Sequence, residues 1–420
     1  MRRRAPGAAV GLGLAFVLWG LAAVPRAGAE TWKGAELERK WREAPWHLGP
    51  FRVQPALVIT NAGVDSNVYY SPTDPVKDFT LTAGPAATVY LPIYRKLVLS
   101  VQGSPQYVWY SKTEQERTWN YYASGAVQLS LKSVFFSLDA KYSDARERWN
   151  TEIDIRPRRV EKGYGGSVLL KTSWKTSVSL GYRTAGYDYE SVVYDEVFDV
   201  RERLNRQESY ADLSLYYQAS SRRRFFIDLE YGVFDFEDAD QAMLKDSRSG
   251  AAYAGFEFSR LGRRVRGTVR LGYKKFDIRN AEGIDYAGLV GDARLSVRVA
   301  RPLVLRGSFV RDVRFSLWYD NPYFLESRPG AGASVYVFRL LRFDYDYSLG
   351  RSAYPVAQEV EPGVEVKRRD DFEVHSAGIY VRLWKETALG FVANWWARDS
   401  NLDPEDDKRT FFGVNLTYEF

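Results

Sequence analysis

The sequence predicts an all-β protein, a transmembrane up-and-down antiparallel β-barrel of about 18 strands with short periplasmic turns and long extracellular loops. Three observations lead to this prediction. Apolar and polar side chains alternate along most of the chain, short links alternate with long polar ones, and the first residues have the features of an export signal. Together they indicate a chain that is exported and then crosses a membrane with strands.

The N-terminal residues predict export. Three arginines at positions 2–4 precede an apolar run over residues 8–24, and the small residues at 27–29 fit a signal-peptidase site. We therefore predict a signal peptide over residues 1–29. The apolar run is shorter than the roughly 20 residues that a membrane-spanning helix needs, which disfavours a retained helix.

A polar and charged segment follows the predicted signal peptide. Residues 30–50 contain a helix-compatible stretch at 36–40, and we interpret them as a short periplasmic N-terminal arm. From residue 51 to residue 420 the chain is predicted to form the outer-membrane β-barrel. The period of the hydrophobic pattern changes at this boundary from one compatible with a helix to two.

Strict alternation marks the predicted strands. In residues 79–91 and 412–420, side chains at every second position are mainly apolar, and those between them are mainly polar or small. Because successive strand residues point to opposite faces, each segment has one apolar and one polar wall. In a soluble β-sandwich the apolar wall would pack on a second sheet. The apolar positions of the first segment are Phe79, Leu81, Ala83, Ala87, Val89 and Leu91.

The lengths of the links favour a barrel over a sandwich. Short links such as 132–133, 175–176 and 301–302 alternate with long polar stretches. Short turns at one end and long loops at the other are typical of transmembrane barrels, whereas sandwiches have Greek-key crossings. The long stretches are 71–78, 144–161, 188–208, 351–370 and 398–409.

Aromatic residues cluster toward the predicted strand ends. Tyr and Trp settle at headgroup depth, so two bands would form girdles about 25 Å apart. Toward the short turns lie Phe135, Phe136, Trp174, Phe225, Phe258, Trp384 and Phe420. Toward the long loops lie Trp109, Tyr121, Tyr187, Trp318, Trp395 and Trp396.

Two segments carry a resemblance to known proteins. The last seven residues, Val414-Asn415-Leu416-Thr417-Tyr418-Glu419-Phe420, resemble the C-terminal signature of bacterial outer-membrane proteins. This resemblance implies that Val414, Leu416, Tyr418 and Phe420 form the membrane-insertion C-terminus.

The predicted first hairpin carries a second resemblance. Gly63-Val64-Asp65-Ser66-Asn67-Val68-Tyr69, with Pro72-Thr73-Asp74 and Asp78-Phe79 after it, resembles the β-barrel porin family found in exopolysaccharide export clusters. The chain departs from that family by having Val64 where an aromatic residue is common. The likeness covers only the first few strands and implies a conduit for export of a surface polymer.

Charged side chains on the polar face are the candidate pore-lining residues. Strand parity predicts a basic arc on three neighbouring strands, formed by Arg266, Arg270, Lys274, Arg294, Arg298 and Arg306. Acidic residues lie before and after it in strand order: Asp212, Asp228, Glu230, Glu257, Asp344 and Asp346. Opposed arcs would set a transverse field on passing solutes. Alternatively, the same charges form cross-strand salt ladders that stiffen the wall.

Aromatic side chains of the polar face allow two interpretations as well. They could form a stacking track for sugars, or they could fill space inside the barrel. These residues are Tyr216, Tyr253, Tyr336, Tyr380 and Trp396.

The composition argues against enzymes, metal proteins and nucleic-acid binding. The chain has no cysteine and two histidines, and its net charge is +6. His375 and Ser376 are adjacent, so in a strand they point to opposite faces and cannot act together as base and nucleophile. No phosphate-binding loop or His-x-x-x-His pair is present. We therefore expect no enzymatic activity, no metal, no cofactor and no nucleic-acid partner.

Three functions are carried forward for this predicted protein of the outer membrane of a Gram-negative bacterium. The first is a porin-like conduit for export of polysaccharide or another surface polymer. The second is a general diffusion porin for small polar solutes, and the third is a structural or adhesive surface barrel. Expected partners are outer-membrane lipids, lipopolysaccharide, the barrel-assembly machinery and, for the first function, periplasmic polymer-export components.

Overall fold

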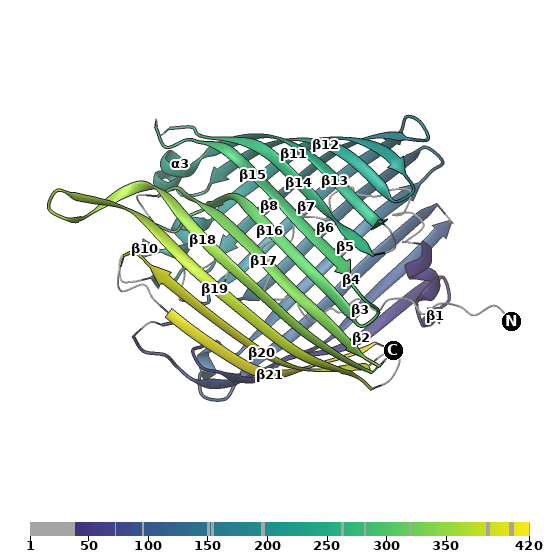
Figure 1. Cartoon of the computed structure of the whole chain (residues 1–420), viewed down its shortest axis with the longest axis horizontal. Helices are drawn as coiled ribbons and strands as arrows, with labels where there is room; N and C mark the ends of the chain where they lie inside the picture. The colour runs from purple at the N-terminus through teal and green to yellow at the C-terminus, as the bar shows by residue number, and fades with distance from the viewer. Residues whose placement is uncertain are drawn as a thin grey trace.

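The chain forms a single closed barrel of tilted antiparallel strands (Figure 1). The structure is a computed structural model that describes residues 38–419 apart from 72, 95, 149–151, 153–154, 195–197, 262–263, 281–282, 319–320, 339, 384–386 and 403–406. The predicted signal peptide and the terminal Phe420 lie outside the described residues, as does Trp384.

Eighteen of the described strands form the barrel wall. The first seven are β2 (Phe51–Asp65), β3 (Asp78–Tyr94), β4 (Leu97–Tyr110), β5 (Thr118–Ser130), β6 (Val134–Arg146), β7 (Arg158–Lys171) and β8 (Thr176–Tyr189). They continue with β11 (Arg206–Ser220), β12 (Arg223–Phe236), β13 (Ser247–Leu261), β14 (Val265–Ile278), β15 (Tyr286–Arg298) and β16 (Leu303–Phe315). The last five are β17 (Tyr323–Val337), β18 (Leu341–Glu361), β19 (Val364–Arg382), β20 (Thr387–Ser400) and β21 (Asp407–Glu419).

Each strand pairs with the next one along the chain, and β21 pairs with β2 to close the ring. A bulge between Ile59 and Ala62 interrupts this seam, and within it Asn61 adopts a φ of 53° and donates its backbone N–H to the Asn415 side chain at 3.0 Å. Any Cβ at Gly63 would lie 2.0 Å from the Phe412 carbonyl oxygen. Glycine therefore allows the first and last strands to approach each other.

The two faces of the wall follow the predicted alternation. Val101 and Leu289 are 60% and 70% exposed on the outside, whereas Thr80 and Thr82 are buried on the inside. In β21, Phe412 is 62% exposed, and Val414, Leu416 and Tyr418 share its outward face. The inner face therefore carries the polar residues of each strand, as the period of two requires.

Short turns and long links lie at opposite ends of the barrel. β1 (Trp46–Leu48) and the last described residues of β21 lie at one end, on the right in Figure 1, and α3 (Ala239–Lys245) lies at the other. The long-link end also carries η2 (Glu114–Glu116), β9 (Val193–Tyr194), β10 (Phe198–Asp199) and α2 (Val200–Leu204). Since long loops of such barrels are extracellular, the end with β1 and the short turns is periplasmic.

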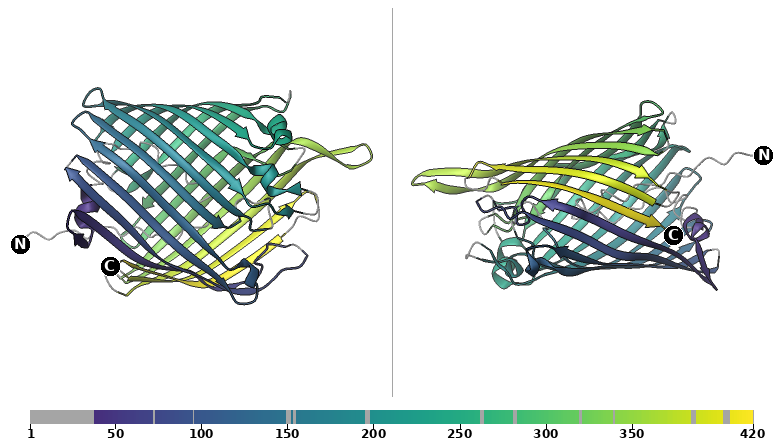
Figure 2. Two further views of the ribbon diagram at one scale, coloured as in Figure 1. Left: turned by 180° about the vertical axis from the view of Figure 1, so that it is seen from behind. Right: turned by 90° about the horizontal axis from the view of Figure 1, so that it is seen from below.

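One predicted long loop is instead a hairpin. Residues 351–370 continue strands β18 and β19 beyond the neighbouring strands, and this hairpin projects from the barrel in Figures 1 and 2. Backbone pairing runs from Ala357 with Lys367 to Glu361 with Val364. Gly363, with a φ of 81°, permits the tight turn that makes this pairing possible.

The N-terminal arm reaches the periplasmic end of the wall. Residues 38–43 are helical, and β1 (Trp46–Leu48) pairs with the start of β2. Ala44 is buried together with Tyr90 and Val98, and Trp41 packs against this cluster. Among the described residues, no helix is long and apolar enough to cross a membrane.

The aromatic bands are less uniform than predicted. Phe225 is exposed on the outer face, but Phe135 is buried in an inward cluster with Tyr216 and Phe226. Tyr187 likewise faces inward and packs beside α2. At both ends of the barrel, aromatic side chains of the strands therefore point either outward or into the interior.

Candidate functional site

The six predicted basic residues all lie on the inward face of β14, β15 and β16, but three of them are paired. Arg270 contacts Asp292 at 2.5 Å, and Lys274 contacts Asp312 at 2.5 Å. Arg306 contacts Asp346 at 2.8 Å. These ion pairs favour the interpretation of this part of the wall as a salt ladder.

The two carboxylates Asp292 and Asp312 were missed by sequence reasoning. Asp292 lies two residues before Arg294 and therefore on the same face, and Asp312 has the same relation to Arg314. The same alternation that places the basic residues on the inward face also places Asp292 and Asp312 there.

The other three predicted cations differ from these. Arg266, Arg294 and Arg298 are exposed to the interior, and none of them has an ion pair within the described residues. Arg266 and Arg298 lie toward the periplasmic ends of β14 and β15. An uncompensated basic group therefore remains in the periplasmic half of the lumen. These residues are called the periplasmic arginines below.

The predicted acidic residues are mostly paired as well. Arg183 contacts Asp212 at 3.5 Å and Glu230 at 2.9 Å. Glu257 contacts Arg224, and Arg342 contacts Asp344 at 2.9 Å. Asp228 is buried on the same face of β12 as Glu230. Opposite charges therefore lie next to each other along most of the wall, and they do not separate into one basic and one acidic arc.

Four of the five predicted stacking residues already carry a guanidinium group on a ring face. Arg224 lies 4.6 Å from the ring of Tyr216, and Arg270 lies 4.1 Å from that of Tyr253. Arg342 covers Tyr380 at 4.3 Å, and Arg148 covers Trp396 at 4.6 Å. Tyr336 is exposed. Cation–π contacts of this kind hold the arginines along the wall.

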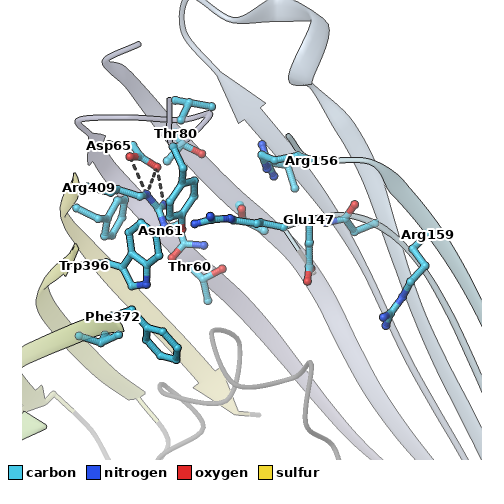
Figure 3. Close-up of a pocket in the computed structure, with 18 of the residues that line it drawn as sticks. Thr60, Asn61, Asp65, Thr80, Glu147, Arg156, Arg159, Phe372, Trp396 and Arg409 are labelled. Atoms are coloured by element: carbon cyan, nitrogen blue, oxygen red, sulfur yellow. Dashed lines mark hydrogen bonds and ion pairs between the residues drawn. The ribbon is translucent and has the colours of Figure 1, made fainter. Parts of the chain in front are cut away.

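A cavity of about 410 Å³ lies in the extracellular half of the lumen (Figure 3). Its described lining contains three acidic residues, Asp65, Glu147 and Glu326. It also contains seven arginines: Arg148, Arg156, Arg159, Arg206, Arg314, Arg328 and Arg409. Aromatic residues complete the lining, namely Tyr70, Tyr110, Tyr189, Phe315, Phe324, Phe372, Trp396 and Phe411.

At the seam of the barrel, arginine and aromatic groups are stacked. Arg409 binds Asp65 at 2.5 Å and lies 4.6 Å from the ring of Tyr70. Arg148 lies 3.9 Å from the same ring and also contacts Trp396. Figure 3 shows Arg409, Asp65 and Trp396 on one side of the cavity, with Arg156 and Arg159 facing them. Guanidinium groups and ring faces thus alternate along one wall.

Described residues of the loop between β6 and β7 contact opposite sides of the lumen at its outer end. We call this loop, residues 147–157, the crossing loop. At its near side, Arg156 contacts Tyr110 and lies 3.6 Å from Glu116. Its Glu152 reaches Ser316, Leu317 and Tyr354. Tyr354 lies on β18, whereas Ser316 and Leu317 directly follow β16. Both places are about half a turn from β6 and β7 in strand order, so the described residues of this loop contact both sides of the barrel.

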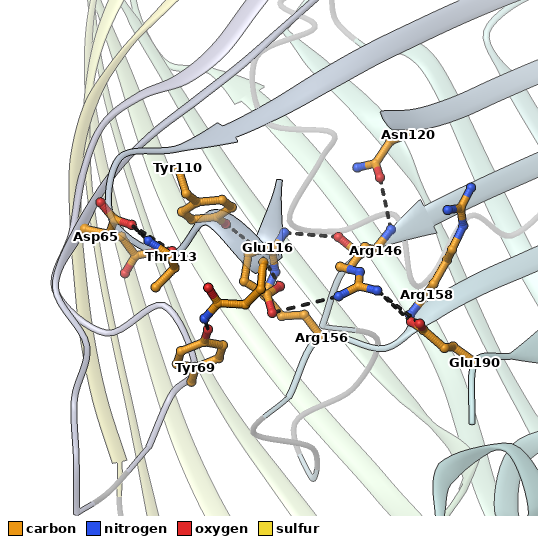
Figure 4. A network of polar contacts seen from close by, with 12 residues as sticks. Asp65, Tyr69, Tyr110, Thr113, Glu116, Asn120, Arg146, Arg156, Arg158 and Glu190 are labelled. Atoms are coloured by element: carbon orange, nitrogen blue, oxygen red, sulfur yellow. Dashed lines mark hydrogen bonds and ion pairs between the residues drawn. The ribbon is translucent and has the colours of Figure 1, made fainter. Parts of the chain in front are cut away.

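A polar network fixes the near end of the crossing loop (Figure 4). Arg146 binds Glu190 at 2.8 Å, and its backbone N–H donates to the Asn120 side chain at 3.0 Å. Arg158 contacts Asp144 at 2.5 Å. Strands β5 to β8 are thereby tied together where the loop leaves the wall.

The family of the chain follows from its match to a family model. Residues 45–420 match the model described as "Putative beta-barrel porin 2". The chain belongs to this family. It is accordingly an outer-membrane porin-like β-barrel of a bacterium.

Solved structures support the fold. The outer membrane protein opdK from Pseudomonas aeruginosa is 10% identical, with a TM-score of 0.51, and the match covers 88% of this chain and 98% of that one. OccAB3 from Acinetobacter baumannii is 10% identical, with a TM-score of 0.50 and coverage of 88% and 99%. At such low identity the likeness shows the shared barrel fold alone. No curated protein matches the chain.

Glu152 and Lys245, which both lie between strands at the extracellular end of this porin, have displaced pKa values. Burial raises the pKa of Glu152, although the hydrogen bonds from Ser316, Leu317 and Tyr354 oppose the shift. Burial, together with the positive charge of Arg203, lowers the pKa of Lys245 to about 7. Lys245 is fully buried and donates to the Ser316 carbonyl at 2.8 Å and the Arg203 carbonyl at 3.2 Å. A neutral amine has the two N–H groups that these carbonyls need.

His375 and Ser376 occupy opposite faces of β19 in the porin wall. The His375 ring shares a hydrogen bond of 2.7 Å with the Tyr345 hydroxyl on the outer face, while Ser376 pairs with Asp346 on the inner face. In the part of the chain that the structure describes, no three His, Asp or Glu side chains gather as metal ligands would.

Proposed function

We propose that this porin is an outer-membrane channel through which a polysaccharide or another surface polymer leaves the cell. The observation that carries the proposal is the lining of the cavity, where arginines alternate with aromatic rings. Ring faces such as that of Phe372 offer apolar surface to the C–H face of a sugar, and guanidinium groups offer paired donors to carboxylates.

The charge of the lining suggests what kind of polymer would pass. Its arginines outnumber its described acidic residues, and the periplasmic arginines add positive charge nearer the entry side. A lumen of one prevailing sign raises the local concentration of solutes of the opposite sign. Acidic saccharides are therefore expected to enter more readily than neutral ones.

A second candidate function, passive diffusion of small polar solutes, is favoured by the crossing loop. It narrows the lumen at Glu152, and the cavity beside it has the size of a site for a small molecule. A channel of this kind would discriminate by size more than by charge.

Current measurements in planar bilayers test the first candidate against the second. Acidic oligogalacturonate is added on the periplasmic side of the purified channel, with neutral maltohexaose as the matched probe. The proposal expects interruptions of the open current by the acidic oligomer at concentrations at which the neutral one has little effect. Equal interruption by both would support unselective diffusion, and no current under any condition would contradict both channel functions.

The expected partners belong to the same proposal. The outward face of β21, with Val414, Leu416 and Tyr418, would contact lipid and lipopolysaccharide after insertion by the barrel-assembly machinery. Periplasmic polymer-export components would deliver the polymer at the end where the arm packs on Tyr90. Co-purification of the full chain with such components, and its loss when the arm is replaced, would test this.

A further inference from the structure

Basic side chains occur at successive turns of the periplasmic end. The described residues of every periplasmic turn from the β3–β4 turn to the β15–β16 turn include a lysine or an arginine, and none of them is Asp or Glu. We call these basic residues the rim cations. They are Lys96, Lys132, Lys175, Arg222, Arg264 and Arg301. All except the half-buried Lys175 are exposed.

The rim cations differ from the cations of the extracellular links in their partners. At the extracellular end, Arg117 contacts Glu114 at 3.1 Å, and Arg279 contacts Asp246 at 3.6 Å. None of the rim cations forms an ion pair with another part of the chain that the structure describes. Their charge therefore attracts anions from outside the protein.

Large apolar and aromatic side chains are exposed beside the rim cations. Trp174 is 85% exposed, and the ammonium group of Lys175 lies 4.3 Å from the centroid of its ring. Phe338 and Tyr94, at two other periplasmic turns, are 90% and 76% exposed. Aromatic rings of Trp and Tyr prefer the headgroup region of a bilayer to water. The rim thus combines positive charge with side chains suited to a membrane interface.

The apolar outer face of the wall reaches as far as these turns. Tyr217 and Phe225 are exposed and pair with each other across β11 and β12, close to the turn that carries Arg222. Because the apolar face lies in hydrocarbon, its end marks the depth at which headgroups begin. The rim cations therefore lie at the depth of the phosphate groups of the inner leaflet.

The distribution of the rim cations around the barrel indicates which anion they meet. The turns that carry them extend from β3 to β16, which is most of the circumference. A periplasmic protein or a polymer strand would contact only part of such a rim. Lipid surrounds a membrane barrel on all sides and can therefore contact every one of these turns.

We propose that the rim cations bind the phosphate groups of anionic phospholipids in the inner leaflet of the outer membrane. Arginine offers paired N–H donors to phosphate oxygens, and lysine offers a compact positive charge. The exposed rings of Trp174 and Tyr94 lie among the same headgroups. These contacts hold the periplasmic end at a fixed depth in the membrane. The inference needs the barrel to be in the membrane, and it does not depend on what the channel transports.

The test measures lipid selectivity of the full-length barrel in phosphatidylcholine bilayers. Electron spin resonance of spin-labelled phosphatidylglycerol and spin-labelled phosphatidylcholine gives their relative association with the protein. At low ionic strength we expect the wild type to favour phosphatidylglycerol at least about threefold, because each Lys or Arg near the surface attracts anionic lipid. The fourfold variant Lys96→Gln, Lys132→Gln, Arg222→Gln and Arg301→Gln should bring this ratio close to one.

A matched control removes the same charge from the other end of the barrel. Lys77→Gln, Lys112→Gln, Arg201→Gln and Lys367→Gln replace exposed cations at the extracellular end and should retain the wild-type ratio. Heat-modifiable gel mobility identifies the folded barrel in each preparation. An equal loss of selectivity in both variants would contradict a specific role of the rim, and an unchanged ratio in a folded rim variant would overturn the proposal.

The salt dependence of the wild type tests the proposal without any substitution. The preference for phosphatidylglycerol should fall toward one as KCl is raised, because salt screens exposed charges. A wild-type ratio of one at low ionic strength would overturn the proposal. In that case, binding of soluble oligogalacturonate that is lost in the rim variant would assign the rim cations to a soluble polyanion instead.

Discussion

The arginines of the lumen have different surroundings in its extracellular and periplasmic halves. In the extracellular half, Glu152 of the crossing loop reaches residues on the opposite side, and arginines such as Arg409 and Arg314 are held by carboxylates and ring faces. In the periplasmic half, the periplasmic arginines face open space and have no ion pair in the described chain. The extracellular half therefore holds its arginines in pairs and stacks, whereas the periplasmic half leaves its arginines exposed to the lumen.

The largest effect is expected from a change that tests the assignment of faces on which this comparison depends. Val414 lies opposite Phe391 on the outer face near the middle of β21. Arginine there would face lipid at a cost of about 2–4 kcal/mol, so Val414→Arg should greatly reduce insertion. Thr417→Arg, on the inner face, should insert nearly as well as the wild type. Outer-membrane yield and heat-modifiable gel mobility measure both, and equal damage would contradict the assignment.

A moderate effect on ion selectivity is expected from the periplasmic arginines. The double substitution Arg294→Gln and Arg298→Gln removes two unpaired positive charges from the lumen. The channel should therefore become more permeable to cations. Reversal potentials in a KCl gradient report this shift. The control is Arg270→Gln with Asp292→Asn, which removes an existing pair without changing net charge and should leave the reversal potential in place. An unchanged potential in the first variant would show that these arginines do not set selectivity.

A smaller effect concerns the pH dependence of loop packing. The pKa of Lys245 is lowered from 10.5 to about 7 in the folded protein, so folding favours the neutral amine. The stability gained is fully present above pH 10.5 and is lost as the pH falls toward 7, by about 1.4 kcal/mol for each pH unit in that window. Unfolding free energies in denaturant should therefore fall between pH 10 and 7.5 in the wild type. Lys245→Met should be less dependent on pH, and parallel curves would refute the assignment.

The strands of the wall were predictable from the sequence because the alternation of apolar and polar side chains can be recognised within each short segment. Alternation alone places Val101 outside and Thr80 inside, and it also assigns the inward face of β14 to Arg270 and Lys274. Short links between alternating segments determine that neighbours in sequence are neighbours in the barrel. These features need no knowledge of distant contacts.

The interior was less predictable because loops have no period. Glu152 contacts residues more than 160 positions away, and nothing in its neighbourhood of the sequence marks it. The hairpin of residues 351–370 looked like a loop because its length and polarity resemble those of the other long links. Pairing of lumenal charges was underestimated because Asp292 and Asp312 were not considered together with the cations on their face.

Single-channel conductance before and after removal of the crossing loop tests most directly how this loop affects the lumen. Residues 148–156 are replaced by a short Gly-Ser link that joins β6 to β7 without reaching Tyr354. We expect a large, steady increase in conductance with the barrel still folded. A conductance equal to that of the wild type would contradict it, because the outer half of the lumen would then not be closed by this loop.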